Sequence, residues 1–281
     1  MNPGWICDLC GNEFPPAGQP PTRCPICADD RQFIPRSGPS WSELNPAADN
    51  ELTAAELEPG FWQLTIRPSV GIGQHTYVIE STDGNVLWEP PGFIGPSLTD
   101  WLDEHGGLCA ITASHPHLVG ASVSLSHRYG RVPVWFNDND RRWVTRPDPV
   151  IEFWRDTTNI APGLHLVQCG GHFPGSAVLH LPQAADGRGA LLTGDTIMAV
   201  PHPEMVSFMR SFPNLIPLSP RLVRGIADRV AELRFDRIYA AFGAPVAPKA
   251  AEIVASSAQR YIDWVTDAQM DPDERNGQAS G

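Results

Sequence analysis

The stretch GGHFPGSAVLHLPQAADGRGALLTGDT (residues 170–196) decides the fold of this chain. Its two apolar runs, 176–181 and 189–193, have the length and the turn-forming borders of buried strands. His172 stands in a glycine-rich turn before the first run, and Asp195 follows the second. Both are metal-ligating residue types at strand ends, where an open α/β layer gathers its functional side chains. We therefore predict that His172 and Asp195 belong to one site.

A second stretch, ASHPHLVGA (113–121), follows an apolar run at 108–113 that reads as a buried strand. It places His115 and His117 one residue apart. Two imidazoles at this spacing converge on one ion if a third comes from elsewhere, and His172 supplies it. Three imidazoles and the Asp195 carboxylate suffice to hold Zn²⁺ or Fe²⁺. We predict a metal site made by these four residues.

The order and local sequence of these motifs resemble the metallo-β-lactamase fold superfamily. Its motifs read H-x-H-x-D-H, G-H-x-x-G-[SH] and a Gly-Asp after a strand; here they read HPHLVG, GHFPGS and TGD, and the resemblance covers about residues 61–265. It implies an α/β fold, a four-layer αβ/βα sandwich with its metals at one edge. It also implies that His115, His117 and His172 are the ligands of the first metal and that Asp195 is the bridging carboxylate.

The chain departs from the superfamily pattern where a second metal would be held. The Asp and His of H-x-H-x-D-H fall on Val119 and Gly120, and the last ligand His falls near Phe242. The usual Asp-x-Gly falls on EPPG (89–92). One carboxylate is too little to hold a second divalent cation. We therefore predict at most one metal in the sandwich, and expect Val119→Asp with Gly120→His to raise the affinity for a second ion if the backbone tolerates the two side chains.

Four cysteines near the N-terminus form two C-x-x-C knuckles, CDLC (7–10) and CPIC (24–27). Four thiolates at this spacing make a tetrahedral soft-metal site. Disulfides and a redox dithiol are the alternatives, and disulfides are disfavoured in a reducing compartment. We expect Cys24→Ser to remove this metal and to leave the sandwich folded. The predicted ligands are Cys7, Cys10, Cys24 and Cys27.

The residues around these knuckles resemble the rubredoxin-like module found at the end of rubrerythrins. The match runs from Trp5 through Gly11, Pro20-Pro21 and CPIC to Phe33. The resemblance implies iron with a redox role, whereas the same four-cysteine geometry holds zinc equally well in zinc ribbons. A module of this size builds little core, so we expect the metal to hold it folded.

Length and composition set the remaining expectations. The 281 residues, 42% of them hydrophobic, suffice for one large domain plus a small module. We expect a rubredoxin-like module over 1–36, a linker or surface wrap over 37–60, a metallo-β-lactamase-like domain over 61–270 and a disordered tail over 271–281. A net charge of −12 disfavours nucleic-acid and acidic membrane partners. The apolar runs are too short to span a membrane, and the N-terminus lacks the features of a signal peptide, so a cytoplasmic location is expected.

The predicted function is a single-metal hydrolase of a small or medium organic substrate of the ester, thioester or lactone type, with Asp195 as catalytic residue. One alternative is a mononuclear iron enzyme like the superfamily's persulfide dioxygenases, and another is a non-catalytic binding protein. Residues 201–218 are expected to cover the metal pocket. His75, His202 and Arg210 are possible substrate contacts, and a redox partner or a homo-oligomer is possible.

Overall fold

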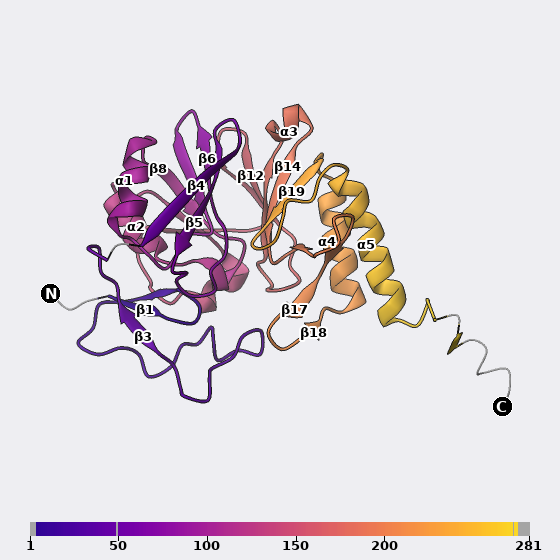
Figure 1. The fold of residues 1–281 in the computed structure, drawn as a ribbon, viewed down its shortest axis with the longest axis horizontal. Helices are drawn as coiled ribbons and strands as arrows, with labels where there is room; N and C mark the ends of the chain where they lie inside the picture. Colours follow the sequence, from indigo (N-terminus) through magenta and orange to yellow (C-terminus); the bar gives the residue numbers. More distant parts are fainter. Residues whose placement is uncertain (1–3, 49, 272, 275–281) are drawn as a thin grey trace.

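Two β-sheets face each other in this protein, and helices cover the outer face of each (Figure 1). The computed structural model describes residues 4–48, 50–271 and 273–274. The strands of the first part of the chain form a seven-stranded sheet, and those of the second part form a five-stranded sheet. This is the αβ/βα sandwich predicted from the sequence.

The seven-stranded sheet has the order β10-β9-β8-β7-β6-β5-β4. Its first four strands in the chain pair antiparallel, and β7 to β10 pair parallel. The strands are β4 (Glu51–Glu58), β5 (Phe61–Arg67), β6 (Thr76–Ser81), β7 (Gly84–Trp88), β8 (Leu108–Thr112), β9 (Val134–Asn137) and β10 (Ile151–Trp154). Helices α1 (Pro96–Glu104) and α2 (Ser122–Arg128) provide the crossovers, and the 3-10 helices η1 (Pro116–Leu118) and η2 (Asp138–Trp143) follow β8 and β9.

The five-stranded sheet has the order β11-β12-β13-β14-β19, with β14 and β19 parallel. Its strands are β11 (Thr157–Ala161), β12 (Leu164–Gln168), β13 (Ala177–Leu181), β14 (Ala190–Gly194) and β19 (Arg237–Ala240). Helices α4 (Pro220–Ala231) and α5 (Ala250–Val265) cover it, and the short α3 (Ala184–Gly187) joins β13 to β14. Two hairpins follow β14: β15 (Met198–Ala199) with β16 (Val206–Ser207), and β17 (Met209–Ser211) with β18 (Ile216–Pro217).

Alternation along the strands explains the layers, because successive side chains of a strand point to opposite faces. In β7, Val86 and Trp88 join the cluster between the sheets, whereas Leu87 packs in the cluster with α1 and α2. In β14, Leu192 lies between the sheets and Leu191 packs in the cluster of α4 and α5. These two central strands are therefore apolar on both faces.

The N-terminal segment forms a small three-stranded sheet, β2-β1-β3, from β1 (Trp5–Cys7), β2 (Glu13–Phe14) and β3 (Trp41–Glu43). Figure 1 shows it at one edge of the sandwich, and the loop between β2 and β3 reaches the β17–β18 hairpin, where Ser211 donates to the Arg31 carbonyl. Its core is not separate: the cysteines share one apolar cluster with Phe136, Trp143 and Phe173 of the sandwich.

Of the two alternatives for 37–60, a linker or a surface wrap, the linker does not hold for the two stretches that form strands. Residues 41–43 form β3 of the small sheet, and residues 51–58 form β4, the edge strand of the seven-stranded sheet. The segment ELTAAELE was missed because this edge strand leaves all of its side chains exposed or half-buried, so its apolar residues do not stand out. Of the predicted tail, 272 and 275–281 lie outside the described residues.

None of the helices within the described residues is long and apolar enough to cross a membrane.

Candidate metal centres

The four N-terminal cysteines come together as one buried cluster. Cys7 ends β1, Cys10 follows in the tight turn before β2, and CPIC forms the second knuckle. The Cys7 and Cys27 Sγ atoms lie 3.6 Å apart, and the Cys10 and Cys24 Sγ atoms lie 3.8 Å apart. Thiolates about 2.3 Å from one tetrahedral ion stand about 3.8 Å from each other, whereas a disulfide is about 2.0 Å long. The spacing fits a four-thiolate metal site.

Backbone and amide donors surround the sulfur atoms, as a thiolate cluster requires. The Cys27 backbone N–H and the Asn12 amide each lie 3.5 Å from a cysteine Sγ, those of Cys24 and Cys10 respectively. Hydrogen bonds from the other thiols, that of Cys10 foremost, hold the pKa of Cys7 far below its usual value. Every ligand atom is buried, so the site is closed to solvent.

The predicted histidine site also assembles. His115 and His117 follow β8, His172 lies in the turn between β12 and β13, and Asp195 comes directly after β14. One ligand atom from each lies within 4.8 Å of all the others. His172 Nε2 and His117 Nδ1 are 3.3 Å apart, and His115 Nε2 is 3.7 Å from Asp195 Oδ2. Nitrogen ligands about 2.0–2.1 Å from one tetrahedral ion stand about 3.3 Å apart, so the cluster fits a single ion.

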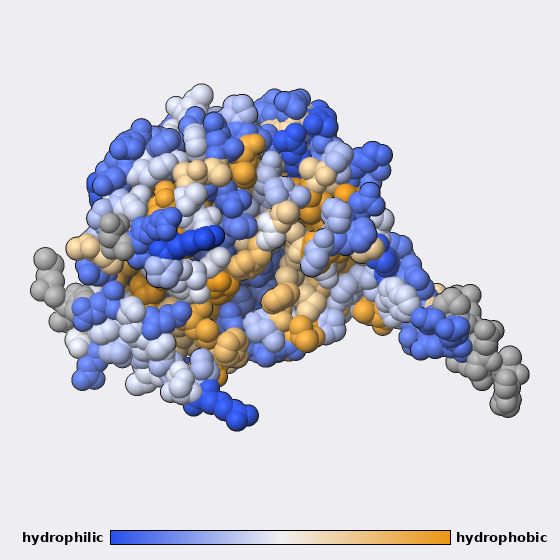
Figure 2. Space-filling model, viewed as in Figure 1, coloured by the Kyte–Doolittle hydropathy of each residue, from blue (hydrophilic) through white to orange (hydrophobic). Residues whose placement is uncertain are grey.

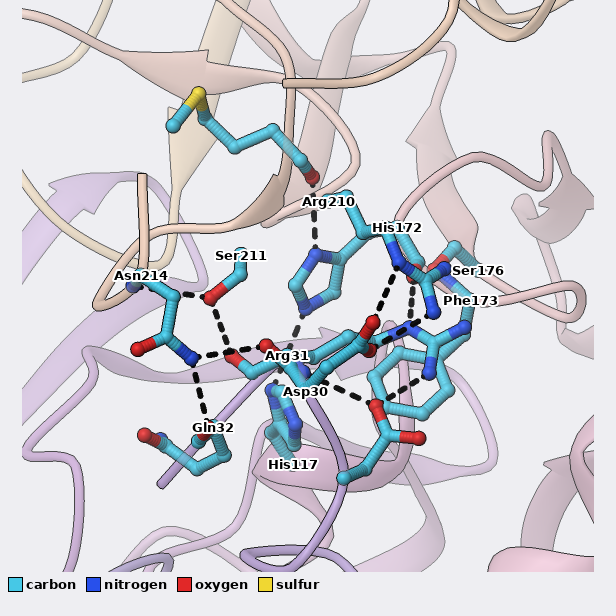
Figure 3. Close-up of polar contacts among 12 residues, drawn as sticks. Asp30, Arg31, Gln32, His117, His172, Phe173, Ser176, Arg210, Ser211 and Asn214 are labelled. Carbon is cyan, nitrogen blue, oxygen red and sulfur yellow. Dashed lines mark hydrogen bonds and ion pairs between the residues drawn. The ribbon is translucent and has the colours of Figure 1, made fainter. Parts of the chain in front are cut away.

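Two hydrogen-bonded contacts orient the rings. His172 Nδ1 donates to the Met209 carbonyl at 3.0 Å, which leaves Nε2 unprotonated (Figure 3). Behind His115, Ser114 Oγ lies 2.7 Å from the ring Nδ1 and donates to Glu89 Oε1 at 2.6 Å. In this arrangement His115 Nδ1 carries the hydrogen, and Nε2 faces the cluster. Orienting contacts of this kind are typical of metal-ligating histidines.

Burial keeps the imidazoles neutral. It lowers the pKa of His172 to about 4, and burial together with neighbouring positive charge lowers the pKa of His115 and His117 well below the usual range. Neutral rings offer the lone pairs that a metal needs. Burial also raises the pKa of Asp195 to about 7. Its side chain keeps 13% of its surface exposed and that of His115 none, so the open side of the cluster lies at Asp195.

The residues that replace the ligands of a second metal are fixed by the backbone. Gly120 has φ +53°, and a Cβ there would stand 2.1 Å from the Pro90 carbonyl oxygen. A histidine does not fit here, so the condition on which Val119→Asp with Gly120→His was expected to raise the affinity for a second ion is not met at Gly120. Gly194 pairs with Ala240 in the parallel register, which sets Phe242 beside the strand end that carries Asp195.

The three suggested substrate contacts lie outside the cluster of ligand atoms. His75 packs through its ring Nδ1 against Gln63 Nε2 at 3.2 Å, and His202 accepts from the backbone N–H of Glu204 in an exposed turn. Arg210 forms an ion pair with an N-terminal residue, Asp30, at 2.8 Å. The guanidinium is therefore already paired, which is a different role from binding a substrate carboxylate.

Sequence reasoning missed four residues that contact the ligands or their backbone. Glu89 and Ser114 lie behind His115, and Asn12 and Arg31 come from the cysteine module. Ser114 carried a weak signal, being adjacent to His115. Asn12 and Arg31 carried none, because their partners lie more than 100 residues away in the chain.

Solved structures with the same fold belong to metallo-β-lactamases and related metal-binding proteins. VMB-1 aligns with a TM-score of 0.58 at 12% identity, over 78% of this chain and all of VMB-1. FIM-1 from Pseudomonas aeruginosa, a metallo-β-lactamase in its mono-zinc form, aligns at 0.55, with 15% identity over 77% of this chain and 97% of its own. TTHA1623 in a di-iron-bound form aligns at 0.52, with 19% identity over 69% of this chain and 97% of its own. This chain has the metallo-β-lactamase fold.

One relative matches nearly the whole chain. The uncharacterized protein YmaE of Bacillus subtilis (strain 168) is 38% identical over 264 residues, which cover 92% of this chain and 96% of YmaE. The match is too long to be confined to the sandwich, so it includes cysteine-module sequence. This chain belongs to the family of YmaE. No family model matches the sequence.

Proposed function

We propose that this protein is a hydrolase that works with one divalent metal, zinc in the first place, held by His115, His117, His172 and Asp195. The carrying observation is the 3.3 Å separation of His172 Nε2 and His117 Nδ1, with the other two ligand atoms in reach. The donor set of three imidazoles and a carboxylate fits zinc. Val119 and Gly120 replace the ligands of a second ion, which supports a single-metal site.

The chain's own residues divide the remaining work. A bound zinc ion supplies a water of lowered pKa and polarises a carbonyl oxygen. Asp195 is the ligand residue whose side chain keeps exposed surface, so with one carboxylate oxygen on the ion its other oxygen would orient the attacking water. Glu89 and Ser114 hold the His115 ring, and the Met209 carbonyl holds that of His172. These contacts keep the ligands in place through turnover.

An exposed aromatic side chain that follows β19, the strand paired with β14, supports a substrate with an apolar part. Phe242 stands where related enzymes place a ligand histidine, and 37% of its surface is exposed. Arg210 is paired with Asp30, so it is partly neutralised as a partner for a charged substrate group. An ester, thioester or lactone with an apolar acyl group would pack against Phe242 better than a small dicarboxylate would.

The test uses the full chain loaded with zinc, in the absence of oxygen, on ester, thioester and lactone probes with short and long acyl groups. We expect turnover that chelation abolishes and zinc restores. His172→Ala should remove it, and His165→Ala, a histidine of β12 outside the cluster, should not. Oxygen uptake with a persulfide and a requirement for Fe²⁺ would favour the dioxygenase. Zinc bound at the site with no turnover of any probe would contradict the hydrolase.

For the cysteine cluster we propose a structural metal, because all four ligands are thiolates and the site is closed. Zinc there gives a colourless protein. Iron gives visible thiolate charge-transfer bands and would favour a redox role. Metal content and the visible spectrum of protein expressed with both metals available separate the two.

A further inference from the structure

We propose that the cysteine module completes the histidine site, with Asn12 and Arg31 as positioning residues for the ligand-bearing loops. The affinity of the histidine site for metal then depends on the occupied cysteine site. This inference rests on the proposed metal at His115, His117 and His172. It adds to that proposal two residues from a part of the chain that contributes no ligand to the histidine site.

Asn12 holds the loop that carries His117. Its side-chain amide Nδ2 donates to the Pro116 carbonyl at 2.9 Å and lies 3.5 Å from the His117 carbonyl. Its Oδ1 accepts from the Gly120 backbone N–H at 2.8 Å. The side chain is fully buried, so these hydrogen bonds take the place of hydrogen bonds that the loop backbone would otherwise make with water. One side chain therefore closes both ends of the loop from residue 116 to 120.

Arg31 holds the second ligand loop in the same way. Its Nε donates to the His172 carbonyl at 2.6 Å, and its guanidinium lies 4.3 Å above the Phe173 ring. Figure 3 shows the guanidinium beside Phe173 while the His172 and His117 rings face each other. The Arg31 carbonyl accepts from Ser211 Oγ at 3.0 Å, which ties the module to the hairpin β17–β18. That hairpin also supplies the Met209 carbonyl to His172.

The cysteine knuckle fixes where Asn12 stands. Gly11 N–H donates to the Cys7 carbonyl at 2.8 Å, and Cys7 N–H donates to the Asn12 carbonyl at 3.0 Å. The Asn12 amide also lies 3.5 Å from Cys10 Sγ. A metal that holds Cys7 and Cys10 together therefore holds Asn12 against the histidine loop. Without that metal, no covalent or coordinate bond fixes the turn.

The cysteine module packs against the sandwich in close backbone contact. A Cβ on Gly92 would stand 2.4 Å from the Gly11 carbonyl oxygen, and one on Gly71 would stand 2.4 Å from the Gly11 nitrogen. Backbone meets backbone here without side chains between. Glu13, next to Asn12, accepts from the Val123 and Ser124 N–H groups at 2.5 and 3.1 Å and pairs with Arg146. The interface has the dense polar matching of a permanent contact.

Metal titration of the full chain tests the inference without any activity assay. Zinc is added first to fill the cysteine site, and the dissociation constant of the second equivalent is measured. Changes in residues that support metal ligands typically weaken metal binding about 10- to 100-fold. We expect losses of this size for Asn12→Leu and for Arg31→Met. Arg23→Met, an exposed arginine of the same module, is the matched control and should bind as the wild type does.

Two further measurements keep the inference open to refutation. Arg31→Lys keeps the charge but loses the planar Nε donor, so it should also weaken the second site, and it serves if Asn12→Leu does not fold. Co²⁺ at the histidine site should show a changed visible spectrum in the variants. Unchanged affinity and spectrum in both Arg31 variants, with wild-type protein binding two ions, would overturn the inference. Tight zinc binding with no hydrolysis would refute the proposed function alone.

Discussion

The cysteine site and the histidine site of this protein are built in opposite ways. All four cysteine ligands come from residues 7–27, are buried and are of one chemical type. The ligands of the histidine site come from residues 115–195, follow three different strands and leave one carboxylate partly exposed. A closed site with four protein thiolates is typical of structural metals, and an open site is typical of catalytic ones. The difference supports a division of roles, in which the cysteine site, built from one short segment, stabilises the structure and the histidine site, assembled from three strands, carries the chemistry.

The largest expected effect tests the structural half of this comparison. Cys24→Ser should remove the cysteine-site metal and lower the free energy of unfolding of the whole chain by about 4 kcal/mol, the linkage expected when free metal exceeds its dissociation constant about a thousandfold. The sequence alone suggested that the sandwich would stay intact. The shared cluster with Phe136, Trp143 and Phe173 is the reason to expect a wider loss.

Thermal and urea unfolding of metal-loaded protein measure this effect, with Cys109→Ser as a control thiol outside the cluster. A melting temperature that chelation leaves unchanged would show that the metal contributes nothing to the stability of the fold.

A second effect concerns Gly120, which stands where the superfamily motif has a ligand of a second metal. Gly120→Ala should lower the free energy of unfolding by about 3 kcal/mol, because it adds backbone strain at φ +53° to a Cβ clash with the Pro90 carbonyl. Gly106→Ala, also at positive φ but in open space, should show the strain alone. Urea unfolding of both variants gives the difference. Equal losses would mean that the loop gives way and that a ligand fits there after all.

The third effect is a pH dependence of the free energy of unfolding, caused by the buried Asp140 of η2. Burial raises the pKa of Asp140 to about 6, from an unfolded value near 3.8. A raised pKa means that the folded state binds the proton more tightly, so this group's contribution is present below the unfolded value and is lost as pH rises through about 6.

Asp140→Asn keeps an acceptor for the Gly175 N–H and removes the ionisation. Relative to the wild type it should gain about 2 kcal/mol of stability between about pH 4 and about pH 8. If the free energies of unfolding of the two proteins change in parallel with pH, Asp140 has the same pKa in the folded and unfolded states.

The smallest expected effect lies behind the histidine site. Ser114→Ala removes the hydroxyl between Glu89 and His115 Nδ1, so zinc binding at the histidine site should weaken about tenfold, the low end for contacts that orient a ligand. The cysteine site should bind as before, which makes it the internal control. Ser126→Ala, a buried serine of α2 that contacts the Val132 carbonyl, is the matched variant. Equal affinities for Ser114→Ala and the wild type would show that the His115 ring needs no orienting partner.

Much of the fold was readable because its signals are local. The strands around His115 and His172 are apolar runs with turn residues at their borders, and helix α4 begins with Ser219 before Pro220, a sequence typical of a helix start. Segment 51–58 was missed because this edge strand has no fully buried side chain. The short hairpins after β14 escaped because strands of two or three residues carry no period.

The sequence by itself determined which residues can hold metals. C-x-x-C pairs, H-x-H, GH and GD carry their chemistry in the residue types, and strand ends gather such residues at one edge. Tertiary structure alone decided what surrounds them. Asn12 meets Pro116 and Arg31 meets His172 across more than 100 residues of chain, and Gly120 is fixed by the approach of Pro90. Such contacts depend on how the layers pack, and packing leaves no periodic trace in a single sequence.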